Sequence, residues 1–229
     1  MALALDGSAT AFGATVTLST SLTNDVICCF IKYVSGQPTS ITDTAGLTWI
    51  RRYTSGTQGV NACLDLWYAI SPGILTADVI TPVGATGTPR YLVFGVNGAN
   101  TTTPFDVNVS LPAASVGIAG NTNTKTISTT NANTMLLACI DTGNTFPTFT
   151  EPTGFTQIIN AAGSMDASYQ IVSSVQSSVA ITYSWVNSGI AACMLVDAIQ
   201  AAGGTPATPT GQQMIGMNSF GFNPLGFQQ

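Results

Sequence analysis

The sequence predicts an all-β protein: a jelly-roll-like antiparallel β-sandwich built from two similar sets of strands, with an extended C-terminal tail. Short segments rich in β-branched and aromatic residues fill most of the chain, among them "VICCFIKYV" and "RYLVFGVNG". Clusters of Gly, Pro, Asn, Asp and Ser separate them. No window carries an apolar stripe of helical period with caps at both ends. Short strands at this spacing, without alternating helices, are typical of a sandwich or a jelly roll.

The two halves of the chain contain similar blocks in the same order. An alternating β-chain can show such similarity by chance, but order preserved over five blocks argues against chance. We therefore interpret the halves as two similar strand sets folded into one sandwich. The matches, at offsets of 108, 109 and 101 residues, pair Gly46-Leu47-Thr48 with Gly154-Phe155-Thr156, Asn24 with Asn133, and Leu92 with Cys193.

Two further segments complete the predicted organisation. Residues 111–126, "LPAASVGIAGNTNTKT", read as a crossing loop between the halves. Residues 1–203 form the predicted sandwich domain, and residues 204–229 form a linker and an uncharged apolar tail.

The tail is interpreted as a docking peptide. It carries no charge, and its glycines would let the backbone lie close to a partner surface. Ordering costs about 1–2 kcal/mol per residue in backbone entropy. Seven large side chains, at about 1.5–3 kcal/mol each when fully buried, could offset this cost if most of them find pockets. These residues are Met214, Ile215, Met217, Phe220, Phe222, Leu225 and Phe227.

Charge is unusually scarce, because only 7% of residues are charged, against roughly 25% in ordinary globular domains. Soluble monomers usually keep their surfaces charged. A neutral surface suits a protein that is packed in an assembly, the alternative being a secreted or environmental β-protein rich in Thr and Asn. The five basic residues include one adjacent pair, Arg51-Arg52, whose side chains point to opposite faces of a strand. No basic stripe exists, so we expect no nucleic-acid binding.

The N-terminus, "MALALDGSATAFG", lacks a positive n-region, and Asp6 interrupts its apolar start, so it does not resemble a secretory signal. No apolar run approaches the roughly 20 residues of a membrane-spanning helix. We therefore expect synthesis in a cytoplasm, no export by the usual route and no membrane association. The cysteines Cys28, Cys29, Cys63, Cys139 and Cys193 form no C-x-x-C motif and are interpreted as buried thiols.

The residues that enzymes most often use are missing or scattered. The chain has no histidine, which excludes Ser-His-Asp and Cys-His nucleophile pairs. Its acidic residues show no close D-x-D or E-x-D spacing of the kind that a glycosidase site would suggest. A calcium site at Asp43 or Asp141 has only weak support, because no clustered Asp loop exists. We expect no enzymatic activity, catalytic residue, metal or cofactor.

Aromatic residues offer one candidate binding feature. Trp49, Trp67, Tyr68 and Trp185 could form a platform on which sugars stack, although such residues more often lie in the core. Strand alternation places Trp67 with Cys63 and Asp65 on the less apolar face of "CLDLWYAI". Trp67 is therefore expected to be partly exposed, and Trp67 and Trp185 are the candidate glycan-binding residues.

The blocks "GLTWIRRYTSG", "LDLWYAIS", "ITPV", "RYLVFGVNGAN" and "PFDVN" resemble a pattern of jelly-roll domains in structural proteins of tailed bacteriophages. The similarity covers about residues 10–200, and Gly46-Leu47-Thr48-Trp49 and Leu66-Trp67-Tyr68-Ala69 match best. Proteins of this kind act as capsid decoration proteins, head fibres or tail-associated proteins, and some resemble carbohydrate-binding sandwiches. The resemblance carries no catalytic residues.

Together these observations predict a non-enzymatic structural protein of the virion, a decoration or cement protein of a phage capsid that is held to the particle by its C-terminal tail. The expected partners are the major capsid protein or neighbouring copies. The alternative is a carbohydrate-binding jelly-roll module or a tail-associated adhesin. A position on the head is favoured because coiled-coil and fibre repeats are lacking. The sequence leaves trimer, dimer and monomer on a lattice open.

Overall fold

The computed structural model describes residues 2–33, 35–56, 63–87, 89–143, 148–161, 164–186 and 191–203, without the side chain of Cys63. Every regular element in these ranges is a β-strand, and they contain no helix. The predicted all-β class is therefore confirmed. The seven predicted docking residues of the tail lie outside the described residues.

The first half contributes eight strands that form a five-stranded sheet, β1-β8-β3-β6-β5, and a three-stranded sheet, β2-β7-β4. Neighbouring strands are antiparallel throughout. The strands are β1 (Ala4–Phe12), β2 (Val16–Leu18), β3 (Asp25–Tyr33), β4 (Ser40–Thr42), β5 (Ile50–Thr54), β6 (Cys63–Ser71), β7 (Asp78–Val83) and β8 (Arg90–Asn97).

The second half repeats this arrangement, with a five-stranded sheet, β13-β14-β11-β16-β9, and a three-stranded sheet, β10-β15-β12. These pairs are antiparallel as well. The strands are β9 (Ala113–Ile118), β10 (Thr122–Ile127), β11 (Thr134–Asp141), β12 (Phe149–Thr150), β13 (Thr156–Ala161), β14 (Met165–Val172), β15 (Val179–Trp185) and β16 (Ala192–Gln200).

Both halves have jelly-roll connectivity. In each set of eight, the first, eighth, third and sixth strands are neighbours in one sheet, and the second, seventh and fourth are neighbours in the other. Interleaved Greek keys of eight strands in two sheets define the jelly roll. The fifth strand joins the larger sheet beside the sixth in both halves. The predicted sandwich of two similar strand sets is thus present, but each set forms its own pair of sheets.

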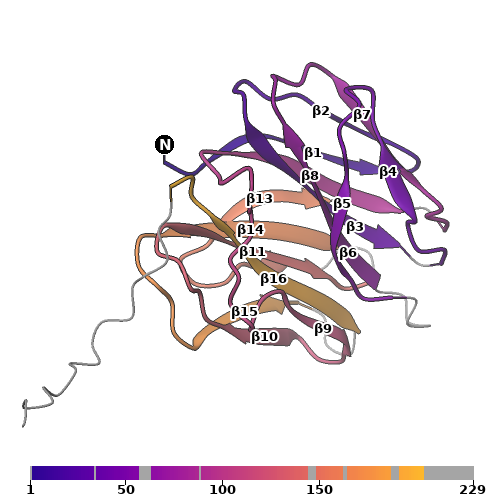
Figure 1. Cartoon of the computed structure of the whole chain (residues 1–229). Coiled ribbons are helices and arrows are strands. Elements are labelled where there is room, and N and C mark those ends of the chain that lie inside the picture. The colour runs from indigo at the N-terminus through magenta and orange to yellow at the C-terminus, as the bar shows by residue number, and fades with distance from the viewer. Residues whose placement is uncertain are drawn as a thin grey trace, which may run out of the picture.

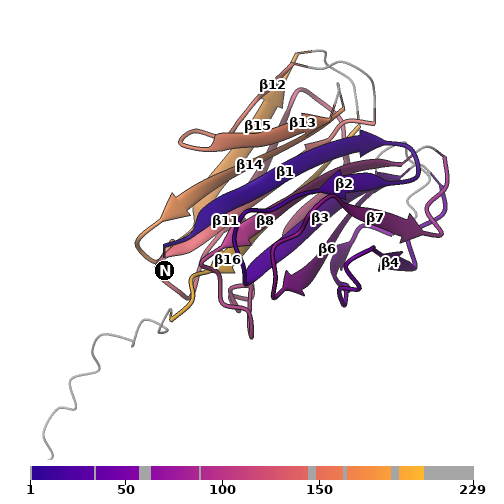
Figure 2. The ribbon, with the colours of Figure 1, turned by 90° about the horizontal axis from the view of Figure 1, so that it is seen from above.

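The four sheets lie in layers, with the five-stranded sheets packed face to face and a three-stranded sheet covering each outer side (Figures 1 and 2). The central layer contains side chains from both halves, including Phe30, Phe94, Leu137 and Leu195. A second cluster lies beneath β2-β7-β4, and a third beneath β10-β15-β12. The central strands β3, β8, β11 and β16 are buried at every position, because both faces of their sheets are covered.

Unusual backbone conformations recur at equivalent places in the two halves. Asn24 and Asn133 have φ values of 62° and 55° immediately before β3 and β11. Gly46 and Gly154, in the turns before β5 and β13, have φ values of 75° and 82°. L-residues seldom adopt this left-handed region, which glycine tolerates and asparagine adopts more readily than most other residues. These matches support the blocks that the sequence paired.

The pairing of the closing strands needs a correction. Leu92 lies opposite Phe30 of β3, and Leu195 lies opposite Cys139 of β11. With Asn24 matched to Asn133, Phe30 is equivalent to Cys139, so Leu92 corresponds to Leu195 and not to Cys193. An error of two residues keeps each side chain on the same face of the strand, so the alternating pattern could not reveal it.

The adjacent arginines of β5 point to opposite sides of their sheet, as predicted. A β-bulge lies between Arg51 and Tyr53. Arg52 reaches the central layer, where its Nε and Nη2 atoms lie 2.8 and 3.2 Å from the carboxylate oxygens of buried Asp197 in β16. Arg51 lies over the Trp67 ring on the outer side, 4.0 Å from an oxygen of Asp65.

The two arginines are expected to differ in their contribution to stability. Arg52→Ala leaves the buried Asp197 carboxylate without its counter-charge and should lower the free energy of unfolding by about 3 kcal/mol. Arg51→Ala removes a longer contact of a more exposed side chain and should cost less than about 1 kcal/mol. Urea unfolding of both variants, with unchanged m-values, measures the difference. Equal losses would contradict the assignment of the Arg52–Asp197 ion pair as a buried contact that links the two halves.

Candidate functional site

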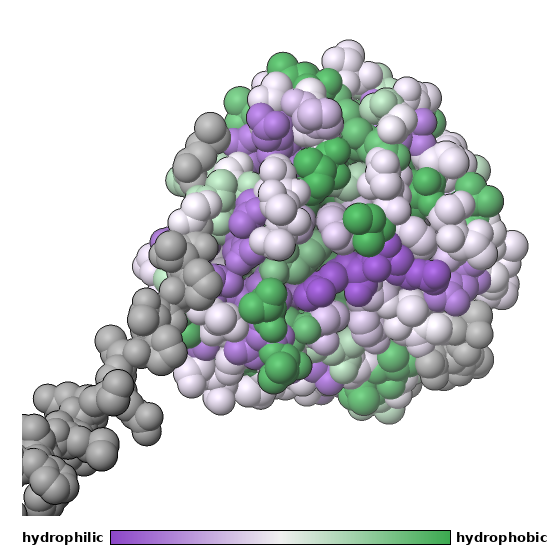
Figure 3. Space-filling view, in the orientation of Figure 1, coloured by the Kyte–Doolittle hydropathy of each residue, from purple (hydrophilic) through white to green (hydrophobic). Residues whose placement is uncertain are grey.

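Charged side chains are concentrated in the interior. Ten of the fifteen charged residues are buried, namely Asp6, Asp25, Lys32, Asp65, Asp78, Arg90, Asp106, Asp141, Asp166 and Asp197. Of the other five, only Arg51 is exposed, and the rest are partly buried. On the face shown in Figure 3, strongly hydrophilic side chains are confined to small patches and one narrow band. The surface is therefore nearly free of charge.

Two buried aspartates occupy equivalent positions in the two halves. Asp65 lies opposite Ile31, and Asp166 lies opposite Ile140. Each accepts a hydrogen bond from a tyrosine hydroxyl, at 3.0 Å from Tyr33 for Asp65 and at 2.9 Å from Tyr183 for Asp166. The tyrosines differ in position, because Tyr33 lies in β3 of the same sheet as Asp65, whereas Tyr183 lies in β15 of the outer sheet.

Other aspartates hold loops in place. Asp6 accepts hydrogen bonds from the backbone N–H groups of Ser21 and Leu22. Asp106 accepts hydrogen bonds from the backbone N–H groups of Thr130 and Asn131. These contacts join segments that are 15 to 25 residues apart in sequence.

A buried charged cluster joins the two halves at one end of the central layer. Burial raises the pKa of Asp141 to about 7, while the positive charges of Lys32 and Arg90 act in the opposite direction. Arg90 Nη1 donates a hydrogen bond of 2.6 Å to Ser164 Oγ. Because Lys32 and Arg90 belong to the first half and Asp141 and Ser164 to the second, the cluster contributes to the contact between the halves.

The described residues offer no set of ligands for a calcium ion at Asp43 or Asp141. Both carboxylate oxygens of Asp43 accept protein hydrogen bonds, from the backbone N–H of Leu47 and the indole N–H of Trp49. Asp141 is fully buried. Within the described residues, no three His, Cys, Asp or Glu side chains lie together in a way that could hold a metal ion.

The candidate glycan platform is not formed by the predicted tryptophans. Trp67 and Trp185 are each only 4% exposed, so the expected partial exposure of Trp67 is wrong. The less apolar face of β6 is covered by the sheet β2-β7-β4, and Trp67 packs beneath it. Trp185 lies in the cluster beneath β10-β15-β12. Trp49 is half-buried, and its indole N–H is used by Asp43.

The cysteines behave as small apolar residues where their side chains are described. Cys28, Cys29 and Cys139 are buried free thiols, as predicted, and Cys193 is also buried. Burial raises the pKa of Cys28, Cys29 and Cys139 above its usual value. Low thiolate content and burial make these residues unreactive.

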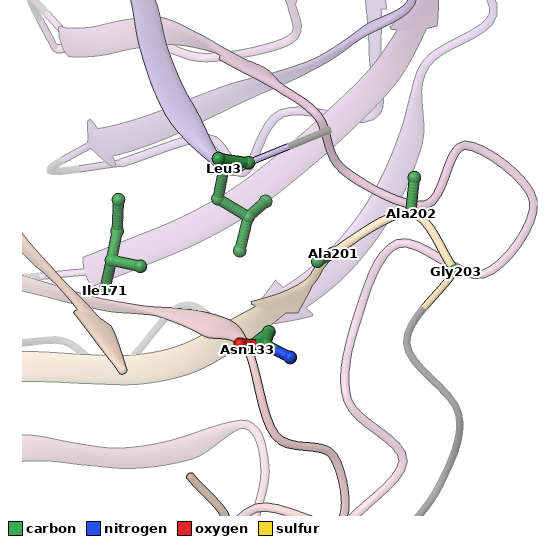
Figure 4. Close-up of a pocket in the computed structure, with 7 residues that line it drawn as sticks. Leu3, Asn133, Ile171, Ala201, Ala202 and Gly203 are labelled. Atoms are coloured by element: carbon green, nitrogen blue, oxygen red, sulfur yellow. The ribbon is translucent and has the colours of Figure 1, made fainter. Parts of the chain in front are cut away.

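An uncharged pocket lies where the described chain ends. This terminal pocket, of about 240 Å³, is lined by Ala2, Leu3, Asn133, Ile171, Ala201, Ala202 and Gly203 (Figure 4). Leu3 precedes β1 of the first half and Ile171 lies near the end of β14 of the second, so both halves contribute. Ile171 is 48% exposed. The sequence analysis missed these residues, because they are far apart in the chain and form no motif.

A hydrogen-bonded loop between the halves exposes two valines. Val107 and Val109 are 71% and 103% exposed. Asp106 accepts a hydrogen bond from Asn108 N–H, and the Asn108 side chain accepts one from Ser110 N–H. The loop interrupts the run of residues that pairs with β16. Phe105 bridges to Ile199, and after the loop β9 resumes the pairing with β16 at Ala113. Such an interruption protects an edge strand from pairing with other chains.

Comparisons with known proteins give no identification. None of the family models, curated proteins or solved structures compared with this chain matches it. The described part of the chain contains no helical segment with the length and hydropathy that a membrane crossing requires.

Stability is expected to fall as pH rises from about 4 to 7. Burial raises the pKa of Asp25 and Asp166 to about 6 and that of Asp141 to about 7, from an ordinary value of 3.8. Between these values the folded state binds more protons than the unfolded state, so its stability decreases as pH increases. In a protein of this size, about 1 kcal/mol shifts the melting temperature by roughly 2–4 °C.

Calorimetry at pH 4.5 and pH 8 should therefore show a melting temperature several degrees higher at pH 4.5. Asp141→Asn, which cannot ionise, should reduce this difference. A melting temperature that is constant or rises towards pH 8 would contradict the assignment of these carboxyl groups as protonated in the folded state at acid pH.

Proposed function

We propose that this chain is a non-enzymatic structural protein of the virion, a decoration or cement protein of a tailed-phage capsid that is attached through residues 204–229. The observation that carries the proposal is the nearly uncharged surface of the double jelly roll. Free soluble proteins rely on surface charge to remain apart in solution. A protein whose faces are covered in a permanent assembly has no such need.

Exposed apolar side chains support the same proposal. Among the described residues, eleven large apolar side chains are exposed, the most exposed being Val109, Val107, Val186 and Phe12. Single exposed apolar side chains are normal. Their combination with a surface almost free of charge favours contact with other protein surfaces.

The resemblance to phage jelly-roll domains supports the proposal at the level of architecture. Gly46 forms the turn before β5, and Leu66-Trp67-Tyr68-Ala69 lie within β6. These residues belong to a strand and a turn of the sandwich, so the resemblance supports a shared scaffold. The alternative of a glycan-binding adhesin loses its platform, because Trp67 and Trp185 are buried.

The proposal places the protein in the virion after synthesis in the host cytoplasm, with the major capsid protein or neighbouring copies as partners. Its test is density-gradient sedimentation of nuclease-treated lysates from cells that express the gene and release particles. The full chain should band with nuclease-resistant particles in a fixed ratio to the major capsid protein.

A chain ending at Gly203 provides the control. It should keep the melting temperature of the sandwich and remain at the top of the gradient. If the full chain is absent from particles, the proposed function is wrong. If the shortened chain is incorporated at full occupancy, attachment through residues 204–229 is wrong.

A further inference from the structure

The terminal pocket has the size and chemistry to hold an apolar side chain. Its volume of about 240 Å³ lies below the 300–1,000 Å³ typical of small-molecule sites. Its lining contains no charged residue. Leu3 and Ile171 provide apolar walls from the two halves (Figure 4). An apolar group that enters would remove Ile171, now 48% exposed, from water.

The C-terminal segment of this chain matches the pocket in character. Residues 204–229 contain no charged side chain and include Phe220, Phe222 and Phe227, each directly next to a glycine. Charged segments would lose solvation on entering an uncharged pocket without gaining a partner. An uncharged segment with spaced aromatic side chains incurs no such cost.

The fixed position of Ala201 and Ala202 and the proline content of the following residues favour the pocket of another copy over the chain's own. Ala202 N–H donates to Gly98 O and Ala201 N–H donates to Asn133 O, which fixes the chain end in the pocket wall. Residues 204–213 contain Pro206 and Pro209, and proline favours extended backbone. In an extended conformation, the eleven residues from Gly203 to Met214 would span roughly 34 Å at about 3.1 Å per residue. The radius of gyration expected for such a domain is only roughly 17 Å. An extended linker would therefore carry Met214 away from its own domain and towards a neighbouring copy.

We propose that the terminal pocket of one copy receives a phenylalanine from the 214–227 segment of a second copy, so that copies associate by exchanging their C-terminal segments. Exchange of an identical element is a low-cost route to association, because both partners use the same surface. The inference rests on the proposed function in one respect, namely attachment through residues 204–229. It adds that this segment binds a neighbouring copy of the same chain.

The test is sedimentation velocity of the purified full chain over a range of concentrations, compared with three variants. Ile171→Asp places a charge on the pocket wall and should weaken association at least about tenfold, because an unpaired charge is costly to bury. Phe220→Ser combined with Phe222→Ser and Phe227→Ser should have a similar effect. Thr17→Asp places the same charge on an exposed residue of β2 outside the pocket and should leave association unchanged.

Mixing two defective proteins distinguishes exchange from other modes of association. The chain ending at Gly203 retains the pocket, and the Ile171→Asp chain retains the segment. Each should sediment as a monomer alone, and the mixture should form a heterodimer. Circular dichroism should show that the Ile171→Asp variant is folded, which is expected because its side chain is half-exposed.

Three results would overturn the inference: a monomeric full chain at every concentration, wild-type association of the Ile171→Asp variant, or absence of the heterodimer in the mixture. A labelled peptide of residues 211–229 that binds the shortened chain, combined with a monomeric full chain, would assign the pocket to the same copy's segment. Because these experiments use purified protein, their failure leaves incorporation into particles to be decided by the gradient experiment.

Discussion

The fold depends on one constraint: four central strands are apolar along both faces. β3, β8, β11 and β16 are buried at every position. A sheet built around such strands must be covered on both sides, since roughly 25 cal/mol is lost for each Å² of apolar surface left in water. The five-stranded sheets cover each other, and each three-stranded sheet covers the remaining face. Neither half alone covers both faces of its five-stranded sheet.

The same constraint explains where the charges lie. With little charge to distribute, the chain uses aspartates as internal ties, at Asp65 and Asp166 within each half and at Asp197 between the halves. Each buried carboxylate has hydrogen-bond donors or a nearby cation that reduce the cost of burial. The consequence is a surface with few charged groups, on which association with other surfaces meets little electrostatic resistance. The proposed role in an assembly follows from this distribution.

Local features of the fold could be predicted from the sequence, and layering could not. Turn residues such as Gly46 and Gly154 have a local physical cause, and the order of the blocks revealed two strand sets. Strand alternation separated the faces of β6 correctly, but it does not tell whether the less apolar face meets water or a second sheet. That is why Trp67 was expected to be exposed. The terminal pocket is lined by both Leu3 and Ile171, which come together only after folding.

Differential scanning calorimetry of the full chain tests most directly the claim that the two jelly rolls share one core. The structure predicts a single transition, with equal calorimetric and van't Hoff enthalpies, because each five-stranded sheet is the inner cover of the other. The unfolding enthalpy should approach about 0.7 kcal/mol for each residue of the double jelly roll near 60 °C. Two separate transitions, each with about half of the enthalpy, would show that the halves fold independently and would contradict the account.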